Sequence, residues 1–284
     1  MAVRIVVTGA AGRLGQVVVE LLESEGMDVL AVDRQFAEGP SEHRLVADLQ
    51  NLGQVYGALA GADAVVHLAA VPSPGGYPAE HVFGNNTMAQ FHVFEAAARL
   101  GVRRVVSASS FSAYGFPFQR EPIVPDYLPL DEDHPLIPQD PYGLSKVVGE
   151  QIAASFARRN SGTAVSLRFS RVLREDMVLP LVQYAEQKPG PFVRELWSYI
   201  HVRDAARACL AGLTAQIDGH VIVHASAADT LSATPSEELA RRWLPQVPVR
   251  GHAGGERWPL VTVDRAEKLL GFVPEYSWTT AGEH

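Results

Sequence analysis

The chain of 284 residues reads IVVTGAAGRLG over residues 5–15, where a β-branched run leads into three evenly spaced glycines. β-Branched residues favour strands, and glycines permit a tight turn that brings backbone amides close to a phosphate. The apolar spacing from Leu14 to Leu22 then favours an amphipathic helix. A strand, a glycine turn and a helix in this order predict the first unit of a dinucleotide-binding fold. The candidate cofactor-binding residues of the turn are Gly9, Ala11, Gly12, Arg13, Leu14 and Gly15.

Strand-like and helix-like segments continue to alternate up to about residue 170. Because parallel strands need crossover connections, this alternation predicts a doubly wound parallel α/β sheet of the Rossmann type over residues 1–170. Residues 171–284 are expected to form mainly a small substrate-binding lobe, with the chain returning to the sheet. Residues 116–141 contain seven prolines and predict a long ordered loop. Further strands are expected at residues 29–32, 45–47, 64–68, 102–106, 165–169 and 221–224, and helices near 87–100, 142–159, 204–213 and 236–243.

Acidic residues follow the second and third expected strands. Asp33 is placed to accept hydrogen bonds from the adenosine ribose hydroxyls and to repel a 2′-phosphate, which favours NAD over NADP. Arg34, like Arg13 in the glycine turn, offers a guanidinium that could instead meet a 2′-phosphate. Asp48, followed by Leu49, either approaches the adenine or caps a helix, and the sequence leaves both interpretations open.

Tyr142 and Lys146 lie four residues apart at the start of an expected helix, so both side chains share one helix face. A phenol with an ordinary pKa near 10 exchanges protons near neutral pH when a cation stabilises the phenolate. Ser110 ends the fifth expected strand and would orient the reacting oxygen. The neighbouring Ser107, Ser109 and Ser112 are the alternatives for that role.

Composition argues against several classes of function. The formal net charge of −8, without a basic run, disfavours binding to nucleic acid or to an anionic membrane surface. The only cysteine is Cys209, so no intrachain disulfide forms, and the histidines lack the paired spacing of metal ligands. No apolar run reaches about 18 residues and the amino terminus does not read as a signal peptide. A cytoplasmic enzyme without a metal is expected.

The motifs together resemble the extended short-chain dehydrogenase/reductase family, in its NAD-dependent epimerase/dehydratase group. The resemblance rests on TGAAGRLG at 8–15, Asp33, ADL at 47–49, HLAA at 67–70, SSFSAYG at 109–115 and YGLSK at 142–146. It implies that Tyr142 is the acid–base, Lys146 its cationic partner and Ser110 the aligning hydroxyl. It also places Leu68, Ala69 and Ala70 against the cofactor and gives Asn86 a supporting role. A homodimer formed through the helices near 87–100 and 142–159 is a further implication.

The expected substrate is a sugar or a nucleotide sugar. Phe111 and Ser112 stand where the related 4,6-dehydratases carry an Asp-Glu pair, which disfavours dehydration. Arg171 offers a guanidinium for a phosphate, and Arg194 for a phosphate or for the carboxylate that uronate dehydrogenases of the family hold in this loop. Ser73 is a candidate sugar contact.

Three hypotheses follow for the function of the chain. The first is an epimerase that reduces and reoxidises its own NAD within one turnover. The second is a net NAD-dependent dehydrogenase of a free sugar or sugar acid. The third is a dinucleotide-binding sensor without turnover.

Overall fold

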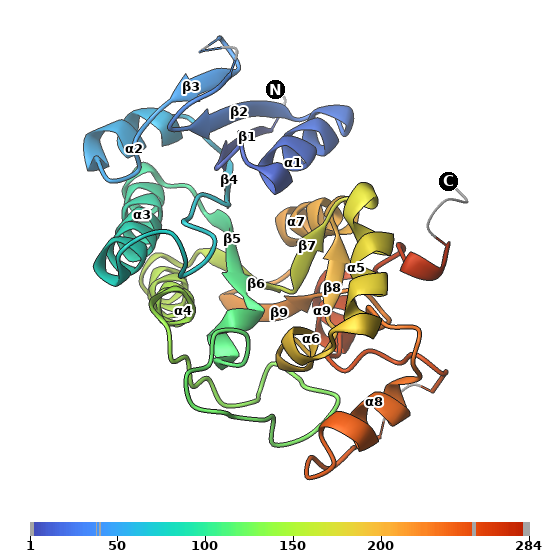
Figure 1. The fold of residues 1–284 in the computed structure, drawn as a ribbon. Coiled ribbons are helices and arrows are strands. Elements are labelled where there is room, and N and C mark those ends of the chain that lie inside the picture. The colour runs from blue at the N-terminus through green and yellow to red at the C-terminus, as the bar shows by residue number, and fades with distance from the viewer. Residues whose placement is uncertain (1–2, 38, 40, 252–253, 281–284) are drawn as a thin grey trace.

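The computed structural model describes residues 3–37, 39, 41–251 and 254–280. These residues form a seven-stranded parallel sheet in the order β3-β2-β1-β4-β5-β6-β9 (Figure 1). The strand order reverses between β1 and β4, which defines a doubly wound fold and confirms the predicted class. The sheet strands are β1 (Arg4–Thr8), β2 (Asp28–Asp33), β3 (Arg44–Val46), β4 (Ala64–His67), β5 (Arg104–Ser110), β6 (Thr163–Phe169) and β9 (His220–Ala225).

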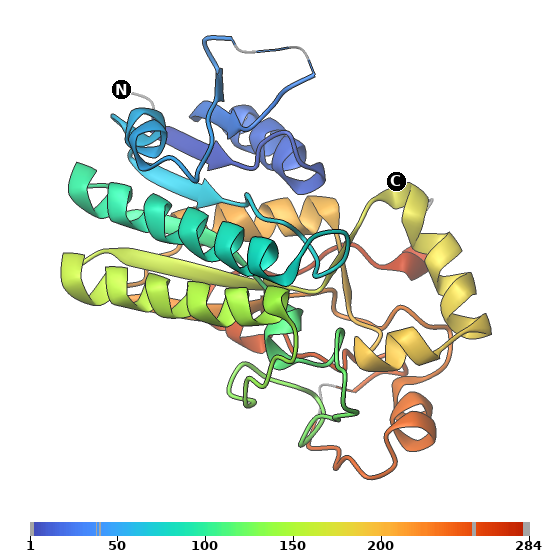
Figure 2. The same ribbon diagram turned by 60° about the vertical axis from the view of Figure 1, so that its left-hand side comes forward.

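Helices cover both faces of this sheet (Figure 2). On one face, α2, α3 and α4 bury alanine, valine and phenylalanine side chains against β1, β4 and β5. On the other face, α1, α7 and α9 pack against the same sheet. The helices are α1 (Arg13–Ser24), α2 (Leu52–Leu59), α3 (Ala79–Leu100), α4 (Pro141–Asn160), α5 (Glu175–Gln187), α6 (Gly190–Arg194), α7 (Val202–Thr214), α8 (Ser236–Trp243) and α9 (Asp264–Leu270). Two short 3₁₀ turns are η1 (Phe111–Tyr114) and η2 (Trp278–Thr280).

A second group of buried residues lies beside the carboxyl edge of the sheet, under α5, α6 and α8. Here β7 (Arg171–Leu173) pairs with β8 (Tyr199–His201) in a separate parallel ribbon. The predicted loop over residues 116–141 is present, and it packs on this lobe through bridges from Leu128 to Val249 and from Leu130 to Val261. The boundary at residue 170 stays a prediction, because α7 and β9 return to the main sheet.

The amino terminus of α4 is fixed by a side-chain cap. Asp140 Oδ1 accepts hydrogen bonds from the backbone amides of Tyr142 and Gly143, both at 2.9 Å, and Pro141 occupies the first helical position. Aspartate and proline at these positions stabilise a helix start. The cap therefore fixes where the Tyr142 side chain leaves the helix at the carboxyl edge of the sheet.

The carboxyl-terminal segment is tied to α7 by one buried carboxylate. Asp204 has no exposed surface, and its Oδ2 accepts hydrogen bonds from the amides of Glu275 and Tyr276 at 2.9 and 2.8 Å. Its Oδ1 accepts a hydrogen bond from Arg207 at 2.7 Å. None of the helices in the described part of the chain is long and apolar enough to cross a membrane.

We predict that Asp204→Ala lowers the free energy of unfolding by about 2–4 kcal/mol, because it removes a fully buried carboxylate that accepts hydrogen bonds from two backbone amides and from Arg207. Urea denaturation followed by circular dichroism measures this change. Asp176→Asn serves as a control, since the pair of Asp176 with Arg174 is exposed, and it should leave the free energy of unfolding nearly unchanged. Equal effects of the two substitutions would contradict the assigned role of Asp204.

Candidate active site

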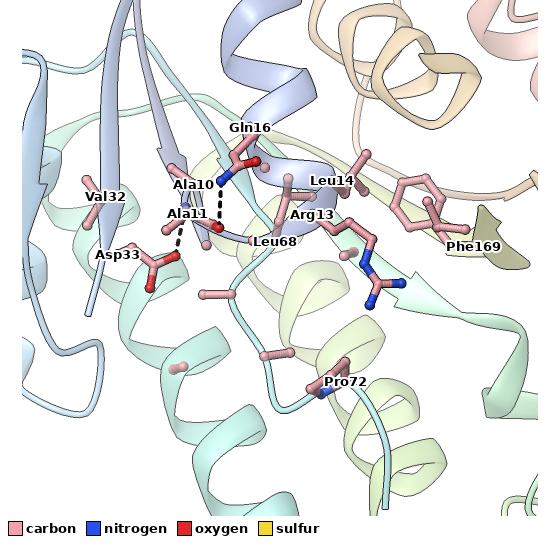
Figure 3. A pocket seen from close by; sticks show the side chains of 18 of the residues that line it. Ala10, Ala11, Arg13, Leu14, Gln16, Val32, Asp33, Leu68, Pro72 and Phe169 are labelled. Carbon is pink, nitrogen blue, oxygen red and sulfur yellow. Dashed lines mark hydrogen bonds between the residues drawn. The ribbon is translucent and has the colours of Figure 1, made fainter. Parts of the chain in front are cut away.

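A cleft of about 1850 Å³ runs along the carboxyl ends of the strands. Its walls come from the glycine turn, from the segments that follow β2 to β6, and from the start of α4. Figure 3 shows part of it, with Asp33 and Ala11 on one side of the glycine turn and Arg13 and Phe169 on the other. The cleft exceeds the roughly 300–1,000 Å³ of a single small-ligand pocket, which suits a site that holds two ligands.

The glycine turn forms a cradle in which side chains would collide with backbone. Gly9 has a φ of +75°, and a Cβ there would lie 2.6 Å from the amide nitrogen of Ala69. A Cβ on Gly15 would overlap the carbonyl oxygen of Gly9. Gly12 precedes α1 without a side-chain cap, so the first amides of that helix stay open toward the cleft. Open amides at a helix amino terminus fit the pyrophosphate of a dinucleotide.

Asp33 has a structural role that the sequence did not reveal. Its Oδ2 accepts a hydrogen bond from Ala11 N at 2.9 Å and its Oδ1 accepts one from Arg34 N at 2.7 Å. The carboxylate thus ties the glycine turn to the end of β2 and still lines the cleft. Each carboxylate oxygen accepts more than one hydrogen bond, so binding of ribose hydroxyls is compatible with this role.

The structure places nearly all other predicted cofactor residues on the cleft wall. The lining includes Arg13, Leu14, Arg34, Asp48, Leu49, Leu68, Ala69 and Ala70, together with the candidate sugar contact Ser73. Asp48 does not cap α2, because Asn51 accepts the hydrogen bond from Gln54 N at that helix start. Asp48 lines the cleft, and its approach to the adenine stays a prediction.

Asn86 is not part of the cleft wall, and its neighbour Asn85 lines the cleft instead. The buried amide of Asn86 accepts a hydrogen bond from Val71 N and donates to Val71 O, at 2.8 and 3.0 Å. It also donates to Ser145 Oγ at 3.2 Å. Asn86 therefore braces the segment after β4 against α4, in keeping with the expected supporting role. Adjacent asparagines on a helix face different directions, and no sequence signal distinguished Asn85 from Asn86.

Ser110, Tyr142 and Lys146 meet on the floor of the cleft. Ser110 Oγ accepts a hydrogen bond from Ser112 N at 3.0 Å, and its hydroxyl also hydrogen-bonds the Tyr142 side chain. Lys146 Nζ donates to the carbonyl of Ala108 at 2.8 Å and lies 5.4 Å from the centroid of the Tyr142 ring. The three side chains thus have the mutual geometry that acid–base chemistry on a hydroxyl requires.

Burial changes the acidity of two of these groups. It raises the pKa of Tyr142 above its ordinary value, while the hydrogen bond with Ser110 lowers the pKa and the charge of Asp140 raises it further. Burial lowers the pKa of Lys146 to about 8, against the opposing effect of Glu150. In the protein alone, the net shift of the Tyr142 pKa is therefore upward, opposite to the lowering that the sequence analysis expected from Lys146.

The remaining serines near the end of β5 have different surroundings. Ser109 donates to Glu150 Oε1 at 2.7 Å within a buried network, and Ser112 belongs to η1. Ser107 is 1% exposed within the sheet and does not line the cleft. Ser109 and Ser112 also line the cleft, but Ser110 is the serine that hydrogen-bonds Tyr142.

The two predicted substrate arginines have different surroundings. Arg171 lines the cleft, but its guanidinium is already bound by Glu195, a cleft residue that the sequence analysis did not identify. Arg194 lies at the end of α6 and lines a separate hollow of about 280 Å³, beside Gln119 and Trp243. The structure does not bring Arg194 to the cleft.

No group of three or more histidine, cysteine, aspartate or glutamate side chains in the described ranges is arranged to hold a metal ion. Cys209 is buried in α7, where burial raises the pKa of its thiol to about 12.

A parallel sheet with a glycine cradle and a Ser-Tyr-Lys group defines a dinucleotide-dependent oxidoreductase of the short-chain dehydrogenase/reductase type. The model of the NAD dependent epimerase/dehydratase family matches residues 5–224. The chain belongs to this family, and it is an enzyme of the NAD-dependent epimerase and oxidoreductase class.

Relatives with two different activities resemble the chain. It is 31% identical over 224 residues to a uronate dehydrogenase from Pseudomonas putida, covering 78% of this chain and 75% of that protein. It is 25% identical over 315 aligned positions to a UDP-glucose 4-epimerase from Corynebacterium glutamicum, covering 96% and 92%. A short-chain dehydrogenase/reductase superfamily protein from Agrobacterium tumefaciens, solved with bound NAD, superposes with a TM-score of 0.75 at 25% identity, covering 99% and 95% of the two chains.

We predict that Gly15→Ala weakens NAD binding at least tenfold and destabilises the fold by about 1–3 kcal/mol, because the added Cβ meets rigid backbone. Gly57→Ala is the matched control, since nothing lies within 4 Å of a Cβ in that position of α2. It should keep NAD affinity and raise stability by up to about 1 kcal/mol. Fluorescence titration with NAD and urea denaturation measure both variants. Unchanged NAD affinity in Gly15→Ala would contradict the cradle.

Proposed function

We propose that this enzyme is an NAD-dependent dehydrogenase that oxidises a hydroxyl-bearing carbon of a free sugar or sugar acid. The supporting observation is that the carboxyl-terminal lobe contributes few residues to the lining of the cleft. Beyond Ser110, Tyr142 and Lys146, the cleft is lined by Pro117 and Phe118 of the proline-rich loop and, on the lobe side, by residues 169–172, Glu195 and Ser198. No described residue after Ser198 lines it.

A nucleotide sugar would need more protein residues along the substrate side of the cleft than these. Its nucleoside diphosphate extends well beyond the reacting ring, and the carboxyl-terminal lobe would have to hold it with further donors. The arginine nearest to the substrate side, Arg171, is paired with Glu195 instead of being available for a diphosphate. A compact substrate is the better match to these surroundings. The similarity to a uronate dehydrogenase supports the same reaction class.

Bound NAD would supply the hydride acceptor, held by the glycine cradle and by Asp33. Tyr142, as phenolate, would take the proton of the substrate hydroxyl while the carbon loses its hydride, so that a carbonyl forms. The Ser110 hydroxyl would hold the reacting oxygen beside Tyr142. Lys146, in its charged form, would favour the phenolate and contact the nicotinamide ribose.

The proposal that NAD is preferred to NADP rests on Asp33, whose carboxylate would face the 2′-phosphate of NADP. Its fixed position, with hydrogen bonds from Ala11 N and Arg34 N, supports this preference. A homodimer through α3 and α4 stays a prediction. Met88, Phe91 and Leu144 on these helices are exposed apolar side chains consistent with such a contact.

Epimerisation of a nucleotide sugar is the second candidate. It is favoured by the similarity to a UDP-glucose 4-epimerase, which extends over 96% of this chain. Such an enzyme would form an epimer without net formation of NADH.

We predict that the purified protein reduces added NAD with free sugars, and that Tyr142→Phe lowers kcat by about 10²–10⁴-fold with little change in NAD affinity, because only the proton-transferring oxygen is removed. NADH absorbance with a panel of aldoses, uronates and UDP-sugars measures this, with NAD and NADP compared in parallel. Tyr184→Phe, in an exposed position of α5, is the matched control and should retain full activity. Epimer formation from a UDP-sugar without net NADH would favour the second candidate.

We predict that kcat/KM for oxidation rises with pH from about 7 to about 8, by up to tenfold per unit, and levels off above that, where Lys146 loses the charge that favours the phenolate. Oxidation needs the Tyr142 phenolate, and burial holds the pKa of this phenol above its ordinary value. The reverse reduction uses the phenol and should fall over the alkaline range. Asp140→Asn keeps a capping residue but removes a charge that raises this pKa, so its profile should shift to lower pH. A flat profile for oxidation would contradict Tyr142 as the base.

A further inference from the structure

Arg171 and Glu195 form a two-pronged ion pair on the substrate side of the cleft. Arg171 Nε donates to Glu195 Oε2 at 2.8 Å, and Nη2 donates to Oε1 at 2.5 Å. The guanidinium also lies 5.7 Å from the ring centroid of Phe192. The side chains are 37% and 20% exposed, so the pair is only partly covered and presents polar atoms to the cleft.

The turn that carries Glu195 is held in a costly conformation. Leu196 and Trp197 have φ values of +53° and +46°, in the left-handed region that side chains other than glycine rarely adopt. Burial of Trp197, at 1% exposed, and a 2.8 Å hydrogen bond from Leu231 N to its carbonyl hold the turn. The Glu195 carbonyl is fixed as well, accepting hydrogen bonds from Ser198 N and Oγ. Glu195 therefore faces Arg171 from a rigid position.

We propose that Glu195 determines substrate specificity by restricting the site to uncharged sugars. The inference rests on the proposed dehydrogenase function and narrows its substrate class. A guanidinium binds one carboxylate through two parallel hydrogen bonds, and Glu195 already supplies that carboxylate. The carboxylate of a sugar acid would have to displace Glu195 from Arg171 and would then lie beside the negative charge of Glu195.

A neutral sugar meets no such conflict at this pair. Its hydroxyls both donate and accept hydrogen bonds, so one hydroxyl donates to a carboxylate oxygen while another accepts from the remaining guanidinium N–H. Among residues 169–198, Arg171 is the cation on the cleft wall, while Arg13 reaches the Phe169 side of the cleft from the glycine turn (Figure 3). Arg174 pairs with Asp176 outside the cleft wall, and Arg194 faces the separate hollow. Neither is placed to replace Arg171 as a carboxylate partner.

The test compares kcat/KM for glucose, arabinose, glucuronate and galacturonate in the wild type and in Glu195→Gln. The wild type should prefer the neutral sugars. Glu195→Gln, which keeps size and hydrogen bonding but removes the charge, should raise the uronate-to-aldose ratio of kcat/KM at least about tenfold. The double variant Arg171→Gln with Glu195→Gln should lose that gain. Asp176→Asn breaks a comparable pair outside the cleft and should leave the ratio unchanged.

A wild type that prefers uronates, or a ratio unchanged in Glu195→Gln, would overturn the proposal. Absence of NADH formation with every sugar would instead count against the proposed dehydrogenase function. In that case, calorimetric titration of the NADH-loaded protein with glucuronate and with glucose still decides the role of Glu195. Tighter glucuronate binding by Glu195→Gln than by the wild type supports the proposal, and equal binding rejects it.

Discussion

The buried ion pair between Arg168 on β6 and Glu150 on α4 is the constraint on which the geometry of the site depends. Two N–H groups of Arg168 bind the two carboxylate oxygens at 2.8 and 2.9 Å, and both side chains are 2% exposed. The third nitrogen donates to Tyr114 Oη at 2.7 Å, and that oxygen lies 2.6 Å from His224 Nε2. Burial alone would lower the pKa of Arg168, but these hydrogen bonds raise it above its ordinary value. Because an uncompensated buried charge is costly, α4 is held in one position on the sheet, and Tyr142 is held with it.

The sequence was sufficient to predict the main sheet but not the lobe beside it. Strands β1, β4, β5 and β6 are buried runs rich in β-branched residues, and each is followed by a segment with the apolar spacing of a helix. This pattern is local, so the sequence alone reveals it. Strands β7 and β8 have three residues each, too few to show a period, and β7 pairs with β8 across α5 and α6. Likewise, the loop over residues 116–141 is ordered by partners more than a hundred residues away, which no local pattern records.

In the candidate site, too, the local features could be predicted and the features set by tertiary structure could not. The glycine turn, the Tyr142–Lys146 spacing and the position of Asp33 are local features, and the structure places all of them on one cleft. Asn85 and Glu195 were missed because their roles depend on the rotation of a helix and on a left-handed turn. Arg194 was expected at the substrate from its position in the chain, yet the end of α6 directs it to another hollow. Contacts set by the direction of one side chain lie beyond single-sequence reasoning.

The double use of Asp33 links the choice of cofactor to the integrity of the turn that binds it. The carboxylate that would face the ribose also holds Ala11 N, and so closes the glycine turn onto β2. Replacing it with a small neutral residue to admit a 2′-phosphate would loosen the pyrophosphate cradle at the same time. Cofactor preference in this protein is therefore not an independently adjustable property. An exchange of preference, in evolution or in engineering, would have to supply a new acceptor for the Ala11 amide together with a new partner for the phosphate.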